Sequence, residues 1–213
     1  MAAKFTLCGH RVIQSMRSTF KLALTVISLM CAAFFALAQG PRRSGEQGID
    51  TTRSTLTVRV YKAGLFKFAA DNHEIRAPIA TGTINESSPS VSIKVDTAQL
   101  RVMDPKLSAE KREQVQQRML SPDVLDPNRY PTIEFRSTHV EPNGANQWLV
   151  QGQLTLHGMT RPISFPVERG ANEPYTGAVT LKQTDFGMAP ITIAGGTVKV
   201  KDEVRVEFVI VPR

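Results

Sequence analysis

Residues 148–167 read WLVQGQLTLHGMTRPISFPV, and this stretch decides the fold. Apolar and polar residues alternate on both sides of His157-Gly158, so each flank is expected to be a strand with one apolar and one wet face. Glycine adopts positive φ without steric cost, and tight hairpin turns commonly require such a residue. The stretch therefore predicts a β-hairpin with His157-Gly158 at its turn.

His157 stands at the mouth of this hairpin, where an enzyme could also place a general base. The rest of the sequence supplies no catalytic partner, because it contains no G-x-S-x-G nucleophile motif, no GxGxxG and no P-loop. Asp123 and Asp126 lie close together in SPDVLDPNRYP (121–131), but the Pro and Asn residues there predict a loop. We therefore expect no catalytic residues, and we expect His157 to stabilise the turn without transferring a proton.

The same period-two alternation recurs along the chain after Ile49. Eight segments show it or remain extended, namely 54–61, 73–84, 90–96, 132–140, 148–157, 162–168, 175–184 and 203–211. Turn residues such as Asn143-Gly144 separate many of these segments. The pattern predicts an antiparallel, all-β protein of about eight strands.

One stretch, SAEKREQVQQRML (108–120), breaks this period and is rich in helix-forming residues. Ser108 can cap its start, and Pro122 lies just past its end. Val115 and Met119 form a narrow apolar stripe, whereas the charged residues make the other face polar. We expect this single helix and the proline-rich segment 119–131 to form a lid across one end of the sheet structure.

Residues 1–38 have the three parts of a secretory signal peptide. Arg17 and Lys21 precede an apolar run, LALTVISLMCAAFFALA (22–38), which ends in the small-x-small pattern Ala36-Leu37-Ala38. We expect cleavage after Ala38, a periplasmic or secreted location, and a flexible polar leader, QGPRRSGEQG (39–48). An uncleaved membrane anchor is the alternative, because a largely apolar run of seventeen residues is at the short limit for spanning a bilayer.

The charge of the chain argues against nucleic-acid binding. Its 26 basic and 19 acidic residues give a net charge of +7, but four of the bases and none of the acids precede residue 39. The remaining 22 basic residues are interleaved with the 19 acidic ones, whereas nucleic-acid binding needs a concentrated basic face. Both cysteines, Cys8 and Cys31, also precede residue 39, which excludes disulfides, thiol catalysis and Cys-ligated metals from the later chain.

The later histidines do not have the spacing of a metal site. His73, His139 and His157 form no i,i+2 or i,i+4 pair, so no metal is expected. Asp71-Asn72-His73 is the densest polar group and is predicted to be a turn that leads into a strand. His139 has the same strand phase as Phe135 and could face the interior, where a neutral imidazole can donate a hydrogen bond.

Four blocks in the sequence together resemble a known family. They are SVSIKVDTAQL (90–100), MLSPDVLDPNRYPTIEFRSTHV (119–140), VQGQLTLHGMTRPISFPV (150–167) and LKQTDFGM (181–188). In order and spacing they are similar to the YceI-like family, the polyisoprenoid-binding, lipocalin-like secreted proteins, whose hairpin reads "v.G.LtihG.tr.v" and whose later segment reads "r.dFG". The opening LTVRVYKAGLFKFAADNHEI (56–75) departs from the family's "v.F.i.H.g.s.v.G.F" pattern, so no ligand contact is carried over to 61–75.

The resemblance covers about residues 49–213 and implies an antiparallel, lipocalin-like β-barrel with an elongated apolar lumen. The residues alone leave a sandwich and a barrel both open. The lumen would hold a long-chain isoprenoid or similar amphiphile, with no other cofactor. Two histidines, His73 and His139, are the polar candidates for ligand contact. The apolar candidates, taken from the inward phase of the strands and the dFG segment, are Val58, Val60, Ile93, Val95, Phe135, Trp148, Val150, Leu154, Leu156, Phe165, Phe186, Val206 and Phe208.

Three functions are compatible with such a barrel. The first is a periplasmic or secreted carrier or store for the lipid. The second is an enzyme acting on that lipid, with His73 or His139 working beside Asp71. The third is a stress or redox accessory protein that presents a quinone-like ligand to a membrane protein partner. We favour the first, because a wide apolar face without a catalytic array is what a lipid carrier needs.

Overall fold

The computed structural model describes residues 45–63, 72–170, 174–193 and 198–213. The expected signal peptide, Asp71 and both cysteines lie outside the described residues. Two short 3-10 helices, η2 (Thr97–Gln99) and η3 (Gln183–Phe186), and one α-helix, α2 (Ala109–Met119), occur among the described residues. The strands are β1 (Glu46–Gly48), β2 (Thr55–Ala63), β3 (His73–Arg76), β4 (Ile79–Asn85), β5 (Ser90–Asp96), β6 (Arg101–Val102), β7 (Thr132–Pro142), β8 (Gln147–Leu156), β9 (Met159–Arg169), β10 (Tyr175–Lys182), β11 (Thr192–Ile193) and β12 (Val198–Ile210).

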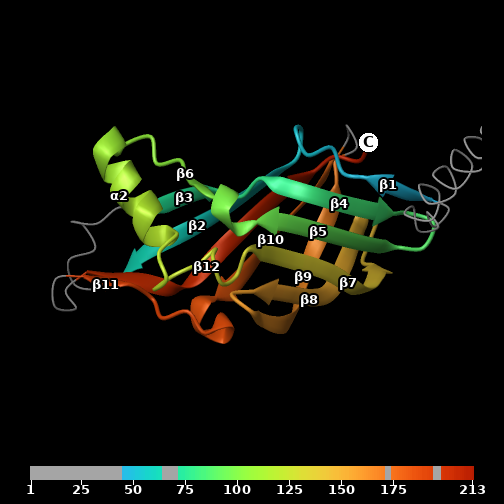
Figure 1. Cartoon of the computed structure of the whole chain (residues 1–213). Coiled ribbons are helices and arrows are strands. Elements are labelled where there is room, and N and C mark those ends of the chain that lie inside the picture. Colours follow the sequence, from blue (N-terminus) through green and yellow to red (C-terminus); the bar gives the residue numbers. More distant parts are fainter. Residues whose placement is uncertain (1–44, 64–71, 171–173, 194–197) are drawn as a thin grey trace, which may run out of the picture. The chain divides into compact units, whose positions relative to one another are not determined.

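These strands form one curled antiparallel sheet in the order β1-β4-β5-β7-β8-β9-β10-β12-β2-β3-β6, with β11 paired to β12 (Figure 1). A single bent segment joins the two sides of the sheet. Its first part, β3, pairs with β2, and its second part, β4, pairs with β5. At the bend, the Ala77 amide donates to the Leu56 carbonyl at 2.9 Å. The sheet therefore curls into an all-β, lipocalin-like barrel, as the family resemblance implied.

The strand count differs from the predicted eight, because the described residues contain twelve strands. The segment 73–84 divides into two strands at Ala77-Pro78, where proline has no amide to continue the ladder. Three short strands, β1, β6 and β11, have too few residues to show an alternating pattern. The first of them also lies within the expected flexible leader: Glu46 to Gly48 pair with Asn85 to Thr83 on β4.

The α-helix begins and ends where the sequence predicted. The Ser108 side chain accepts a hydrogen bond from the Lys111 amide at 3.3 Å, which caps the first turn. Gln116 joins the helix to the sheet, because its side chain accepts from the Val102 amide and donates to the Leu100 carbonyl, both at 2.8 Å. The helix thereby lies over β6, at one end of the barrel (Figure 1).

The predicted hairpin turn is also confirmed. Leu156 pairs with Met159, which leaves His157 and Gly158 as the two turn residues. Both have positive φ, at 51° and 72°. Successive positive φ values define the tight hairpin turn whose twist matches that of the strands, and histidine tolerates this region better than most side chains.

The buried residues form two groups. The larger surrounds the barrel interior and includes Val95, Phe135 and Leu181, and a smaller one of Ile49, Ile79 and Ile210 lies where β1 meets the ends of β4 and β12. The described part of the chain has no helix with the length and apolar character that a membrane span requires.

Candidate ligand-binding cavity

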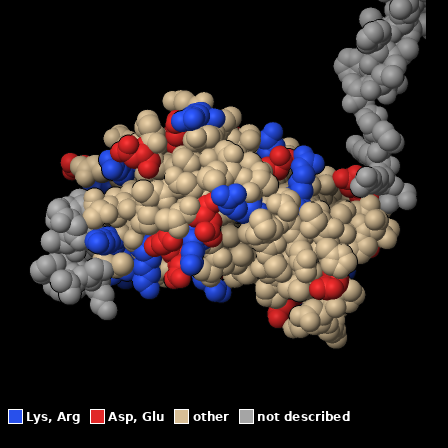
Figure 2. Space-filling view, turned by 90° about the horizontal axis from the view of Figure 1, so that it is seen from below, with Lys and Arg blue, Asp and Glu red and all other residues tan. Residues whose placement is uncertain are grey.

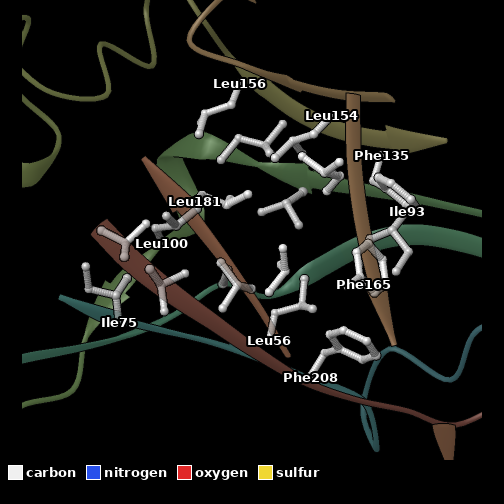
Figure 3. Close-up of a pocket in the computed structure, with 18 of the residues that line it drawn as sticks. Leu56, Ile75, Ile93, Leu100, Phe135, Leu154, Leu156, Phe165, Leu181 and Phe208 are labelled. Atoms are coloured by element: carbon white, nitrogen blue, oxygen red, sulfur yellow. The ribbon is translucent and has the colours of Figure 1, made fainter. Parts of the chain in front are cut away.

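The barrel encloses a cavity of about 960 Å³ that is lined mainly by aliphatic and aromatic side chains (Figure 3). This volume is at the upper end of the usual range for small-molecule sites. The cavity is long: lining residues on β12 run from Lys199 to Ile210, which corresponds to roughly 35 Å along an extended strand. Its shape therefore suits a chain-like apolar molecule better than a compact one.

The structure places twelve of the thirteen apolar candidates on the cavity wall. Their strands alternate as predicted, so every second side chain points inward. The twelve are Val58, Val60, Ile93, Val95, Phe135, Trp148, Val150, Leu154, Leu156, Phe165, Val206 and Phe208. Their contact with a ligand stays a prediction.

Phe186 is the candidate that does not line the cavity. It belongs to η3, after β10 has ended, and only 1% of its surface is exposed. A 3-10 turn does not follow the period-two rule, so the strand phase carried over from β10 does not apply to it. Phe186 packs in the core beside the cavity instead.

The expectation that His139 faces the interior is wrong. Its side chain is 61% exposed and lies 3.5 Å from the Glu141 carboxylate. Ser137 pairs with Gly152, but His139 pairs with Gln151, so Thr138 is an extra residue in β7. Such a β-bulge reverses the phase of the strand, and Val140 lines the cavity where the uninterrupted pattern would have placed His139.

Three aromatic rings form a row on the cavity wall. The Phe165 ring centroid lies 5.4 Å from that of Phe135 and 5.5 Å from that of Phe208 (Figure 3). Gly177, directly opposite Phe208 on β10, leaves the room for the Phe208 ring, because a Cβ at this position would overlap that ring. A glycine here therefore lets the ring lie against the sheet rather than project further into the lumen.

The two ends of the cavity differ in charge. Beside α2, the lining includes four cationic side chains, Lys62, Lys111, Arg118 and Lys199, together with His73. At the other end, beside the β4–β5 hairpin, Glu86 accepts a hydrogen bond from the Tyr175 hydroxyl at 2.8 Å and pairs with Arg169 at 3.6 Å. Glu86 is the one acidic residue on the cavity wall within the described ranges.

His73 is held by a buried carboxylate. Its Nδ1 atom lies 2.6 Å from one oxygen of Asp104, which is only 5% exposed, and the other oxygen accepts from the Glu74 amide at 2.7 Å. Because a carboxylate accepts the hydrogen bond, Nδ1 carries the proton and Nε2 remains for other partners. Sequence reasoning missed Asp104, since it lies 31 residues from His73 and has no repeating pattern around it.

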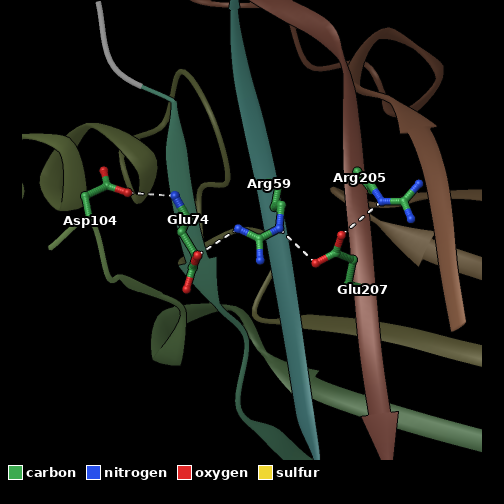
Figure 4. A network of polar contacts seen from close by, with 5 residues as sticks. All are labelled: Arg59, Glu74, Asp104, Arg205 and Glu207. Carbon is green, nitrogen blue, oxygen red and sulfur yellow. Dashed lines mark hydrogen bonds and ion pairs between the residues drawn. The ribbon is translucent and has the colours of Figure 1, made fainter. Parts of the chain in front are cut away.

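The outer face of the barrel carries mixed charges. On the face shown in Figure 2, acidic and basic side chains are interspersed with uncharged ones. Arg59 bridges Glu74 and Glu207 with contacts of 2.8 Å each, and Arg205 reaches Glu207 at 3.0 Å (Figure 4). Hydrogen bonds from Arg59 and then Arg205 hold the pKa of Glu207 below its ordinary value.

The described residues do not bring together three His, Cys, Asp or Glu side chains in a way that could hold a metal. Asp123 and Asp126 lie in a loop of turns, as predicted, and Asp126 has a positive φ of 42°. The described residues therefore present an apolar cavity with one cationic end, together with a charged outer surface.

A curled antiparallel sheet around a long apolar cavity defines a lipocalin-like barrel protein. The model of the YceI-like domain matches residues 48–211, so the chain belongs to the YceI-like family. The resemblance seen in the four sequence blocks is thus confirmed.

Curated relatives are similar over part of the chain. A UPF0312 protein of Vibrio cholerae serotype O1 (strain M66-2) is 34% identical over 134 residues, which cover 59% of this chain and 65% of that protein. The matched segment is thus slightly less than two thirds of the relative's length. A UPF0312 protein of Pseudomonas putida (strain W619) is 35% identical over 77 residues, covering 32% of this chain and 40% of that protein.

Solved structures share the fold at low sequence identity. Burkholderia cenocepacia BcnA superposes with a TM-score of 0.57 and 19% identity, covering 76% of this chain and 98% of that one. A polyisoprenoid binding domain from Saccharophagus degradans, implicated in plant cell wall breakdown, gives a TM-score of 0.52 and 16% identity, covering 79% and 97%. These similarities support the barrel fold assigned above.

Proposed function

We propose that this protein holds a long-chain isoprenoid or similar amphiphile in its barrel and acts as a carrier or store for it. The observation that carries the proposal is the cavity of about 960 Å³ with its nearly continuous apolar wall. The S. degradans neighbour, a polyisoprenoid binding domain, supports the same class of ligand.

Energetics favour exchange between membranes over extraction from them. Transfer of one five-carbon unit from water into the cavity contributes roughly 3–4 kcal/mol, at about 0.8 kcal/mol per buried CH₂. Transfer from a bilayer contributes almost nothing, because the lipid tail is already in an apolar medium. A carrier with this cavity therefore shields its ligand from water without trapping it.

The structure offers little support for lipid-modifying chemistry. His73 and Asp104 form a histidine–carboxylate pair on the cavity wall, but covalent catalysis would also need a side-chain nucleophile within hydrogen-bond reach of the pair. Among the described wall residues, the hydroxyl groups belong to Ser90 and Tyr175, both at the opposite end of the cavity. We therefore assign the pair to ligand contact rather than to catalysis.

We place the protein outside the cytoplasm, in the periplasm or secreted, on the strength of the signal-peptide pattern in residues 1–38. N-terminal sequencing of the exported protein should begin at Gln39. A product that still contains Cys31 would mean that the segment is kept as an anchor.

Native mass spectrometry of the purified protein tests lipid carriage directly. The expected spectrum shows the chain with an added mass, which collision in the gas phase or organic extraction releases as a long-chain lipid. A spectrum with only the bare chain, combined with no binding of added geranylgeraniol, would contradict the proposal.

A further inference from the structure

We propose that the cavity end beside α2 is a head-group site that selects lipids with an anionic head group, a phosphate ester or a carboxylate. This inference rests on the proposed lipid-binding function and adds the orientation and the class of the ligand. It follows from the unequal charge of the two ends of the cavity.

The α2 end gathers positive charge from three separate parts of the chain. Lys62 comes from β2, Lys111 and Arg118 come from the helix, and Lys199 comes from the start of β12. Arg118 is partly neutralised by Asp123 at 3.3 Å. Lys111 and Lys199 form no ion pair within the described ranges, so their ammonium groups are available to an anion.

His73 adds a directed contact at the same end. His73 on β3 pairs with Val60 on β2, and Lys62 lies two residues further along β2. Lys62 in turn pairs with Val200 on β12, the residue after Lys199. Asp104 fixes the ring by accepting from Nδ1, and this carboxylate is itself held by the Glu74 amide. Nε2 is thereby left to meet a head group, in a position that the buried carboxylate defines.

The opposite end is unsuited to an anion. Glu86 is on the wall there, and the Arg169 charge is already shared between Glu86 and the face of the Tyr175 ring, whose centroid lies 5.2 Å away. An anionic head group would meet a carboxylate at this end and lysines at the other. The ligand would therefore place its head beside α2 and its tail along the Phe135–Phe165–Phe208 row.

Three ligands with the same twenty-carbon tail separate head-group recognition from tail binding. Geranylgeranyl diphosphate, geranylgeranoic acid and geranylgeraniol are titrated into the purified protein. The signal is the fluorescence of Trp148, the single tryptophan of the chain, which lines the cavity. Inorganic diphosphate is the fourth probe and tests whether the cavity end beside α2 binds a free anion that has no lipid tail.

The wild-type protein is expected to bind the diphosphate about tenfold more tightly than the alcohol, since two exposed charge contacts together give an effect of this order. The double variant Lys111→Gln/Lys199→Gln should lose most of this ratio and keep its affinity for geranylgeraniol. Lys94→Gln/Lys182→Gln, which removes two exposed lysines that do not line the cavity, should keep the ratio. Addition of salt should lower the ratio in the wild type.

The outcomes distinguish the two proposals and the two head groups. Equal affinity of the wild type for all three lipids would overturn anion selection and leave lipid binding intact. If none of the three lipids bound, the proposed function itself would be overturned. Tighter binding of the acid than of the diphosphate would identify a carboxylate head, and the reverse order a phosphate ester. Inorganic diphosphate bound as tightly as its lipid ester would show a soluble-anion site and contradict a lipid head-group role.

Discussion

The imidazole of His157 lies against the ring of Tyr130, with ring centroids 4.2 Å apart and planes inclined by 52°. The same imidazole donates from Nδ1 to the Phe186 carbonyl at 3.2 Å. His157 thus ties the β8–β9 turn to the loop before β7 and to η3. Its partners are a ring and a carbonyl, which give it a structural role.

We expect Gly158→Ala to destabilise the protein by about 1–3 kcal/mol, because the residue has positive φ. A Cβ there would also lie 2.5 Å from Cε1 of Tyr130. Urea unfolding measures the effect. Gly170→Ala is the control, since its Cβ would meet only ordinary contacts with Pro174, and it should change stability by less than about 0.5 kcal/mol. Equal effects of the two substitutions would contradict the assigned turn.

His157→Asn should leave ligand content unchanged. Asparagine tolerates positive φ, so the turn is kept while the imidazole is removed. Native mass spectrometry of the variant should show the same bound mass as the wild type. Loss of the ligand from a folded His157→Asn protein would give His157 a functional role and overturn the structural assignment.

Phe165→Asp should abolish lipid retention and lower the free energy of unfolding by several kcal/mol. The Phe165 side chain lies between Phe135 and Phe208, so the variant would place an unpaired charge in an apolar cavity. Ser164→Asp puts the same charge on the exposed face of the same strand and should retain the ligand. Retention by a folded Phe165→Asp protein would place the ligand elsewhere.

Glu207→Gln should weaken stability near neutral pH and have little effect in acid. The pKa of Glu207 in the folded protein is below its ordinary value of 4.5, so its ion pairs stabilise the fold above that pH and are lost as the pH falls through the folded pKa. The difference should be at most about 1 kcal/mol, because the pairs are partly exposed. Unfolding at pH 7 and pH 3 measures it.

Glu203→Gln is the control for this pH dependence, since Glu203 lies on the same strand and makes no ion pair within the described ranges. Its effect on stability should be smaller at pH 7. A Glu207→Gln deficit that persists unchanged at pH 3 would show that the side chain acts through packing and not through charge.

Ligand binding should increase the amide protection of α2 and residues 119–131. Val115, Met119 and Leu125 line the cavity, so a bound lipid tail would add contacts to the helix and the loop that follows it. Hydrogen exchange with and without geranylgeranyl diphosphate measures the change, and the β8–β9 turn serves as an internal reference. Equal protection of the helix segment in both states would argue against a lid.

Alternation along the strands made most of the cavity wall predictable, because the inward phase holds wherever a strand is regular. It failed at two irregular places. The extra residue Thr138 in β7 turned His139 outward, and the 3-10 turn after β10 took Phe186 out of the strand pattern. No local sequence rule marks either change: the bulge shows only in the register between β7 and β8, and the 3-10 turn only in the backbone after β10.

The charged end of the cavity was also beyond sequence reasoning. The sequence pattern places Lys111 and Arg118 on the polar face of the helix. Only the packing of α2 over β6 brings them to the end of the cavity. Asp104 meets His73 through the pairing of β3 with β6. These relationships depend on topology, which periodicity does not encode.

The position of β12 has a consequence for how the cavity arises. This strand follows all the others in the chain, yet it lies between β10 and β2 in the sheet. During synthesis, the earlier strands leave the ribosome with a gap of one strand between two unpaired edges, and such edges readily pair with other chains. A nascent chain that ends before Val198 has no enclosed lumen. A lipid can therefore stabilise the folded protein by mass action, but it cannot assist the folding steps that come before β12 pairs with β10 and β2 and closes the barrel.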